Sequence, residues 1–332
     1  MQFVLKRDQY DPFIDFLKAY SIICVVLAHC LPPILCDYSA FAVWGSAQVP
    51  LFLLIQVFHV YKKDDKTSVN IRKLFARIIL PFIILQIFII GLFCLISSDS
   101  VLYVVNKAIV GGGKGPGSYY FWIYLQFAFL LPLLRGLLKR ITMRDCYLFF
   151  IAICIGFDVL CSLIDLPEEL YRLLAIRYLF LICLSMEWIR QGICLNVKKT
   201  LLSIFSISVV LYFYYFNPDL EPFIFNTNWA IHRWMCYFYI SSLLVMLLRI
   251  IYKKIIRFNK IRELFLEFGR SSYEIYLIQM AVFTFVPIAT DELIDNSYVK
   301  FACTFLLEIT LSITLGIALR RHVMVPLLNR NK

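Results

Sequence analysis

The sequence predicts an all-α polytopic membrane protein with about ten transmembrane helices and both termini in the cytoplasm. Hydrophobic residues make up 61% of the 332 residues, and the mean hydropathy is +0.78, which is typical of membrane proteins rather than soluble ones. The apolar runs are long enough for spanning helices and lack the alternation of a membrane β-barrel. Because no polar stretch is long enough for a soluble domain, we expect residues 1–332 to form a single transmembrane domain.

The apolar runs define the expected spans in chain order. Lys6 and Arg7 precede the first run and no small-residue cleavage site follows it, so we expect this segment to be retained as a helix. The expected spans are roughly 13–31, 47–61, 77–97, 119–138, 146–164, 173–189, 199–216, 233–249, 272–290 and 299–319.

The basic residues predict the orientation of these spans. With the N-terminus in the cytoplasm, 26 of the 33 Lys and Arg residues lie in cytoplasmic segments, as the positive-inside rule requires. The same distribution accounts for the net charge of +11, so the expected partner is a lipid bilayer and not a nucleic acid.

The first span carries ionisable residues that are costly inside a bilayer. Lys18 and His29 are eleven residues apart, so they lie on one helix face roughly 16 Å from each other, and Asp15 joins the same stripe. A neutral imidazole can take a proton from a hydroxyl and return one to a leaving group. His29 is also compatible with an interfacial side chain, and Lys18 with one that snorkels or pairs with Asp15.

Three basic residues stand at the start of the third span: Arg72, Lys73 and Arg77. Positive-inside topology alone can explain them. Arg77, however, directly adjoins the apolar run and Pro81, so its guanidinium could point into a cavity and bind phosphate in a bidentate manner.

Two expected outer loops have unusual compositions. The sequence GGGKGPGSYY, residues 111–120, can lie close to a ligand or a neighbouring helix, or can act as a flexible hinge. The aromatic and polar loop from Asn217 to Trp234, which contains His232 and Arg233, has the composition of a sugar-binding surface and equally that of an interfacial aromatic belt.

Asp158 and Glu308 are carboxylates in apolar runs and are therefore candidates for membership of a site. The four histidines lie in different segments with no spacing suited to a metal ion, so no metal site is expected. The sequence also lacks a Gly-x-Ser-x-Gly elbow, a Walker loop and a dinucleotide fingerprint.

Several of these segments resemble the acyltransferase-3 family of integral membrane proteins, which transfer acyl groups, usually acetyl, to surface glycans. Residues 14–18 (IDFLK) with VVLAH ending at His29 resemble the family's opening pattern of Ile-Asp, Leu-Arg and then a histidine. The similar segments continue in the family's order with VPLFLLIQVF (49–58), RIILPF (77–82), YFW (120–122) with LQFAFLLPLL (125–134), and GRSSYEIYLIQ (269–279).

The sequence departs from the family pattern at several positions. Lys18 replaces the family's arginine and loses its planar fork; Gln56 and Val57 replace Ser-Gly; Gln279 replaces a late histidine; and Leu74 replaces the first basic residue of an Arg-x-x-Arg pair. These departures leave donor choice and activity open.

The resemblance implies an O-acyltransferase of the bacterial cytoplasmic membrane that uses acetyl-CoA or another acyl-CoA as co-substrate and holds no permanent cofactor. It implies that His29 is the base or transient acyl carrier, assisted by Lys18 and Asp15, and that Arg72, Lys73 and Arg77 bind the donor's phosphates. The implied acceptor is a cell-surface or lipid-linked glycan. The residues implied on the acceptor side are Tyr119, Tyr120, Trp122, His232 and Arg233. Two further buried polar candidates are Tyr273 and Gln279.

A transporter or flippase for a glycan or acyl intermediate, and a catalytically inactive relative of the family, are the alternatives that the sequence leaves open. The acylated position, the acyl group and the oligomeric state also stay open.

Overall fold

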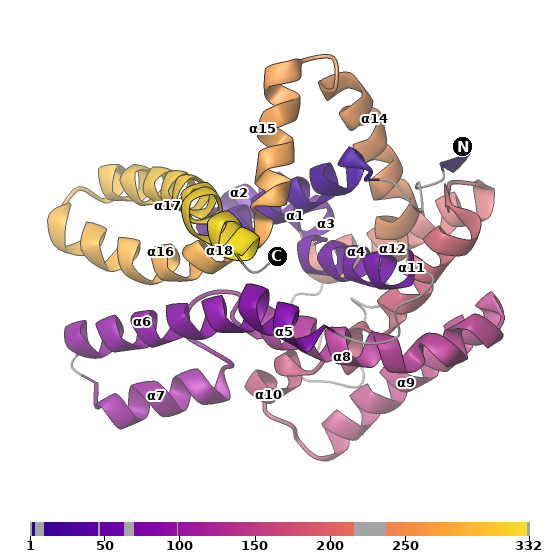
Figure 1. The fold of residues 1–332 in the computed structure, drawn as a ribbon, viewed down its shortest axis with the longest axis horizontal. Coiled ribbons are helices and arrows are strands. Elements are labelled where there is room, and N and C mark those ends of the chain that lie inside the picture. Colours follow the sequence, from indigo (N-terminus) through magenta and orange to yellow (C-terminus); the bar gives the residue numbers. More distant parts are fainter. Residues whose placement is uncertain are drawn as a thin grey trace.

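The computed structural model describes residues 2–3, 10–45, 47–62, 70–97, 99–215 and 237–330, and these residues are almost entirely helical (Figure 1). A short antiparallel pair, β1 (Gln2–Phe3) with β2 (Ile193–Cys194), accompanies the helices. The helices of the first half are α1 (Pro12–Cys30), α2 (Pro33–Tyr38), α3 (Phe41–Trp44), α4 (Gln48–Lys62), α5 (Ile71–Leu74), η1 (Phe75–Ile79), α6 (Leu80–Ile96), α7 (Val101–Val110), α8 (Tyr119–Arg140) and α9 (Met143–Leu163).

The second half of the chain is also helical. Its helices are α10 (Glu168–Leu173), η2 (Ile176–Tyr178), α11 (Phe180–Gln191), α12 (Val197–Tyr215), η3 (Tyr237–Tyr239), η4 (Ile240–Leu244), α14 (Val245–Ile255), α15 (Asn259–Arg270), α16 (Ser272–Leu293), α17 (Ser297–Leu319), η5 (Arg320–Met324) and α18 (Val325–Arg330).

Six helical stretches in the described residues are long and apolar enough to cross a membrane. They are Pro12–Cys30, Phe41–Tyr61, Ile71–Ile96, Tyr119–Arg140, Ser272–Leu293 and Ser297–Leu327. Helices α9, α11, α12 and α14 occupy or overlap the other four expected spans, but they are not among these six. The all-α prediction is thus confirmed, and the count of about ten spans and the orientation of the termini remain predictions.

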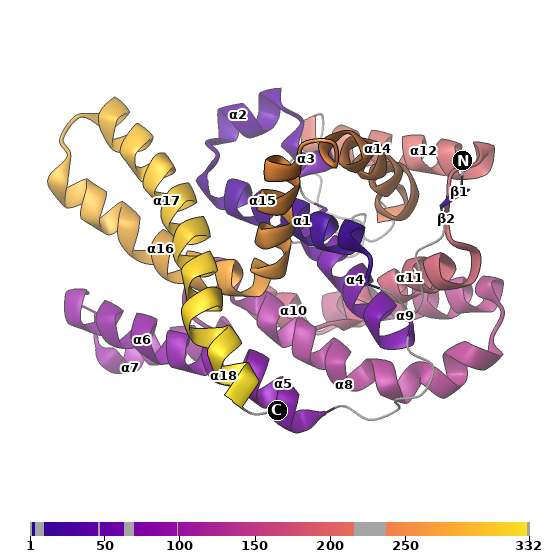
Figure 2. The same cartoon turned by 45° about the horizontal axis from the view of Figure 1, so that its top comes forward.

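Helices α1 and α4 lie at the centre of the molecule (Figures 1 and 2). Helix α1 contacts α4, α14, α15, α16 and α17, while α4 also contacts α8 and α11. The apolar core around these two helices includes the fully buried side chains of Phe13, Leu17, Leu51 and Phe127. Burial of so much apolar surface around α1 fixes the position of the helix that carries Lys18 and His29.

A second apolar cluster joins the far half of α1 to α6, α8 and α16. Phe82 of α6 and Phe121 of α8 stack with their ring centroids 3.7 Å apart, and Met280 of α16 is buried beside them. This cluster holds α6 and α16 on one side of α1, and Figures 1 and 2 show the α16–α17 hairpin beside α6.

The start of α1 is defined by local sequence. The Asp11 side chain accepts a hydrogen bond from the Phe13 amide at 3.0 Å, and Pro12 occupies the first helical turn, two features that favour helix initiation. One turn later, α1 approaches α15 so closely that a Cβ on Gly269 would lie 1.8 Å from the Asp15 carbonyl oxygen. The absence of a side chain at Gly269 therefore permits this helix contact.

We predict that Gly269→Ala lowers the stability of the protein by about 1–3 kcal/mol, because the added methyl group must push α1 and α15 apart. Thermal unfolding in detergent measures the change. Gly136→Ala in α8 is the matched control, since a Cβ there meets no atom within 4 Å. Equal melting temperatures for the two variants would contradict the prediction.

Candidate active site

A cavity of about 1230 Å³ lies between the central helices. Its walls come from α1, α4, α8 and α16, from the continuous α5–η1–α6 helix, from η5 and from the glycine-rich segment 111–118, here called the glycine loop. Lys18 and His29 both line it, which matches the single helix face expected from their spacing. The cavity thus follows the polar stripe of α1.

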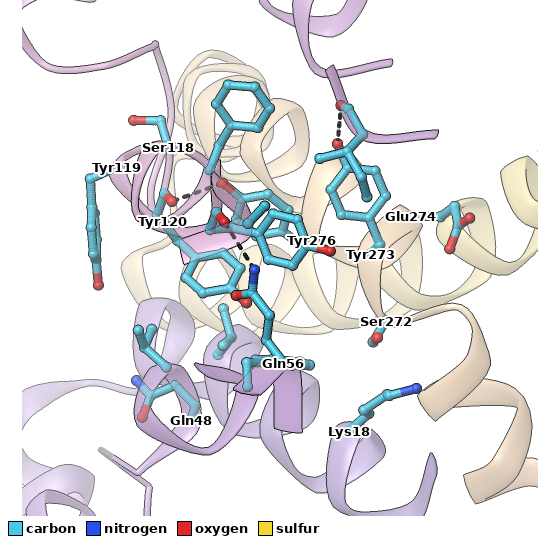
Figure 3. Close-up of a pocket in the computed structure, with 18 of the residues that line it drawn as sticks. Lys18, Gln48, Gln56, Ser118, Tyr119, Tyr120, Ser272, Tyr273, Glu274 and Tyr276 are labelled. Atoms are coloured by element: carbon cyan, nitrogen blue, oxygen red, sulfur yellow. Dashed lines mark hydrogen bonds between the residues drawn. The ribbon is translucent and has the colours of Figure 1, made fainter. Parts of the chain in front are cut away.

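Tyrosines form one wall of the cavity. Figure 3 shows Tyr120, Tyr273 and Tyr276 gathered beside Gln56 of α4, and the rings of Tyr120 and Tyr276 are 5.5 Å apart. The Tyr273 hydroxyl donates to the Ile78 carbonyl at 2.6 Å, and the Tyr276 hydroxyl donates to the Gly117 carbonyl at 3.0 Å. These bonds fix the wall against η1 and the glycine loop.

One end of the cavity is basic, and we call it the basic end. It is formed by α1, α5, η1, the end of α15 and the turn η5, and its cations are Lys18, Lys73, Arg77, Arg270 and Arg320. Arg77 and Arg320 both stand in π-helical turns, η1 and η5, a geometry that is frequent at functional sites.

The cations of the basic end differ in their ion pairs. Arg320 lies 3.8 Å from Glu274, whereas Lys18 and Arg270 lie 3.0 Å and 3.6 Å from Asp15. Lys73 and Arg77 make no ion pair within the part of the chain that the structure describes. Uncompensated Lys and Arg side chains facing a cavity are suited to bind phosphate.

Asp15 does not line the cavity but positions residues that do. Its carboxylate is 5% exposed and accepts hydrogen bonds from the Tyr10 hydroxyl at 2.6 Å and from the Lys18 ammonium at 3.0 Å. The Arg270 guanidinium lies near the carboxylate oxygen that accepts from Tyr10, 3.6 Å away. Asp15 therefore holds two cavity cations at the basic end.

His29 stands in the last turn of α1, and its ring meets the edge of Phe283 of α16 at a centroid distance of 5.8 Å. Its side chain lines the cavity and has no hydrogen-bond partner among the described residues. Within the described structure its imidazole thus faces the cavity without a competing hydrogen bond, an arrangement compatible with a general base.

The glycine loop is packed against α16. Gly115 has φ of 100°, and a Cβ there would lie 2.7 Å from the Met280 carbonyl oxygen, so only glycine fits this position. The Trp122 indole donates to the Gly112 carbonyl at 2.6 Å. The loop thus lies close to a neighbouring helix, which was one of the two expectations for it.

Other residues singled out from the sequence are placed apart from the cavity. The Arg72 side chain is exposed, and Trp122 is used to hold the loop. Asp158 is fully buried and accepts a hydrogen bond from Tyr171 at 2.9 Å, and Glu308 is buried in α17. None of the four lines the cavity. His232 and Arg233 lie outside the described residues.

Tyr119 and Tyr120 line the cavity as expected. Gln279 is fully buried next to them, 3.7 Å from the Cβ position of Gly117, and both polar atoms of its amide lack a partner in the described structure. Gln56 donates to the Tyr124 carbonyl at 3.0 Å. The two glutamines that depart from the family pattern therefore stand at or beside the cavity.

Four cationic residues of the lining were not candidates from the sequence: Lys114, Arg172, Arg270 and Arg320. The glycine run around Lys114 and the position of Arg270 just before the SSYEIY segment were usable signals. Arg172 and Arg320 carry no local signal, because only the tertiary fold brings them to the cavity.

The profile of the acyltransferase-3 family, described as an acyltransferase domain, matches residues 11–321. The chain belongs to this family. No curated protein matches the chain, and no solved structure does. Together with the apolar helices, membership of the acyltransferase-3 family identifies an integral membrane acyltransferase. The matched region includes every cavity residue named above.

We predict that Asp15→Asn destabilises this acyltransferase-3 protein by about 1–3 kcal/mol, because Lys18 and Arg270 lose their shared counter-ion. Thermal unfolding in detergent measures the loss. Glu263→Gln is the control, since Glu263 pairs with Arg262 at 2.8 Å on the surface and such pairs contribute less than about 1 kcal/mol. A fall no larger than that of the control would refute the positioning role of Asp15.

Proposed function

We propose that the protein transfers an acyl group, acetyl above all, from acyl-CoA to a hydroxyl of a cell-surface or lipid-linked glycan. The proposal rests on one cavity that holds both kinds of group. Lys73 and Arg77, which make no ion pair in the described structure, line its basic end, and His29 lines it from the last turn of α1. An acyl-CoA has the matching shape, because its phosphates and its thioester are separated by a long flexible arm.

The proposal includes a topology. Residues 1–332 form one acyltransferase-3 domain of about ten spans in the bacterial cytoplasmic membrane, with both termini in the cytoplasm. The basic end then faces the cytoplasm, where acyl-CoA is made, and His29 lies toward the outer face. The distribution of Lys and Arg along the chain supports this orientation.

At the basic end, Lys73 and Arg77 bind the donor's phosphates, and Lys18 adds positive charge on the path toward His29. Lys18 is already paired with Asp15, so it keeps a fixed position while it faces the cavity. Tyr119 and Tyr120 line the space between the two ends, where their rings pack against the donor's arm or the sugar.

His29 acts as the general base. Its imidazole removes the proton from the acceptor hydroxyl, and the oxygen attacks the thioester carbonyl. The tetrahedral intermediate collapses with cleavage of the C–S bond, and the imidazolium returns the proton to the CoA thiolate. The products are an ester and CoA, so atoms and charges balance.

We predict that His29→Ala abolishes transfer, with a loss of at least about 100-fold in kcat, because the hydroxyl loses its base. Release of the CoA thiol from acetyl-CoA by the purified protein, with a glycan acceptor present, measures the rate. It also separates an enzyme from a transporter, which releases no thiol.

His322→Ala is the matched control for that experiment. His322 is exposed in η5 and does not line the cavity, so its loss leaves the rate unchanged. Wild-type turnover by a folded His29→Ala variant would remove His29 from the mechanism.

We predict that Arg77→Gln raises the KM for acetyl-CoA by about tenfold or more, the effect of losing a hydrogen bond between charged groups. The kcat changes less, because Arg77 contacts the phosphates and not the reacting atoms. Steady-state kinetics with varied acetyl-CoA measures both constants.

Arg72→Gln is the comparison, since Arg72 lies five residues earlier and its side chain is exposed away from the cavity. Its KM stays within about twofold of the wild-type value, because exposed charges are screened by salt. Equal effects of the two variants would mean that the cavity does not select the phosphate-binding residues.

A further inference from the structure

The acceptor side of the cavity carries a second group of positive charge that the donor does not use. It consists of Lys114 of the glycine loop and Arg172 of α10, and both line the cavity. The guanidinium of Arg172 lies beside the loop, 3.7 Å from the Cβ position of Gly111. We call this pair the acceptor-side cations.

The position of the Lys114 backbone is fixed by a buried amide. Gln86 of α6 is 7% exposed, and its side chain makes two reciprocal bonds with Lys114. It accepts from the Lys114 amide at 2.7 Å and donates to the Lys114 carbonyl at 3.1 Å. A loop held in this way presents its lysine from a defined point.

The Lys114 ammonium has no carboxylate partner among the described residues. It rests over the ring of Phe93, 3.6 Å from the centroid, a contact that stabilises a cation only in part. Burial, with a smaller effect of Lys107, lowers the pKa of Lys114 below its ordinary value, and the Asp99 carboxylate offsets only part of this shift.

Arg172 is in a similar state. Its Nε atom is buried without a hydrogen-bond partner, and its guanidinium makes no ion pair in the described part of the chain. A guanidinium and an ammonium that line one cavity without an ion pair can each bind a carboxylate or a phosphate.

The glycine loop contacts α16 within one turn of the residue that the His29 ring contacts. Gly115 packs on Met280, and the His29 ring contacts Phe283 three residues later. Lys114, Arg172 and His29 line the same cavity, and the donor's phosphates are assigned to Lys73 and Arg77, so the acceptor-side cations are left for a second anion.

We propose that Lys114, with Arg172, binds an acidic group of the acceptor, so that the preferred substrate is a sugar carrying a carboxylate or a phosphate. This inference rests on the proposed function and names its substrate class. The acidic group orients the sugar and thereby selects which hydroxyl faces His29.

The test compares binding of three probes that differ at C6 of the sugar: 4-nitrophenyl β-D-glucoside, its glucuronide and its 6-phosphate. Isothermal titration calorimetry with the full-length protein in nanodiscs measures each Kd. We expect at least one acidic probe to bind about tenfold tighter than the glucoside, the gain typical of a charged hydrogen bond. Whether the glucuronide or the 6-phosphate is preferred distinguishes the two acidic groups.

In Lys114→Gln, the preference for the acidic probe is lost while binding of the glucoside is retained. Lys114→Arg keeps the preference because it keeps the charge. Lys107→Gln is the matched control, since Lys107 is an exposed lysine on the preceding helix, α7, and does not line the cavity. If Lys114→Gln fails to fold, Arg172→Gln must reduce the same preference.

Equal or absent binding of the three probes, or an acidic preference that survives both Lys114→Gln and Arg172→Gln, overturns the inference. A rise in the KM for acetyl-CoA without a change in probe binding also overturns it, because the cations then serve the donor. Thiol release is measured separately. A Lys114-dependent preference without thiol release contradicts the proposed function alone.

Discussion

The arrangement of the cavity depends on the contacts of Asp15, above all on its ion pairs with Lys18 and Arg270. Asp15 is nearly buried, it holds Lys18 and Arg270 at 3.0 Å and 3.6 Å, and its backbone carbonyl lies against Gly269. A carboxylate as buried as that of Asp15 is costly to leave without such partners. The contact fixes the start of α1 against the junction of α15 and α16. It therefore also fixes the direction of α1, which carries His29 in its last turn.

The charge of the cavity explains what it can bind. Within the described residues, Lys and Arg occupy seven lining positions, and Glu274 is the carboxylate among them. The seven cations come from four different helices, from two π-helical turns and from the glycine loop, so the fold brings this excess of positive charge together at the cavity. This excess favours anionic ligands, and its division between the basic end and the glycine loop provides for two separate anionic groups.

The sequence could predict the helices and the stripe of α1, because apolar length and a period near 3.6 residues are local properties. It could not decide between Arg72 and Lys73, since neighbours on a helix point about 100° apart and only the fold shows which one faces the cavity. The apolar run around Asp158 indicates a buried carboxylate, but only the fold shows that Tyr171 donates to it and that it does not line the cavity. Lys114 depends on left-handed glycines and on Gln86, which is 28 residues away, so local pattern could not place it.

The tyrosine wall gives the cavity a partly apolar surface between its two ends. Tyr273 and Tyr276 use their hydroxyls on the Ile78 and Gly117 carbonyls, so they present mainly ring surface along the path from Arg77 to His29. Ring surface packs against a donor's flexible arm and displaces water from it. Because water competes with a sugar hydroxyl for a thioester, a passage that excludes water favours transfer over hydrolysis. The same hydrogen bonds that hold the fold thus favour the proposed reaction.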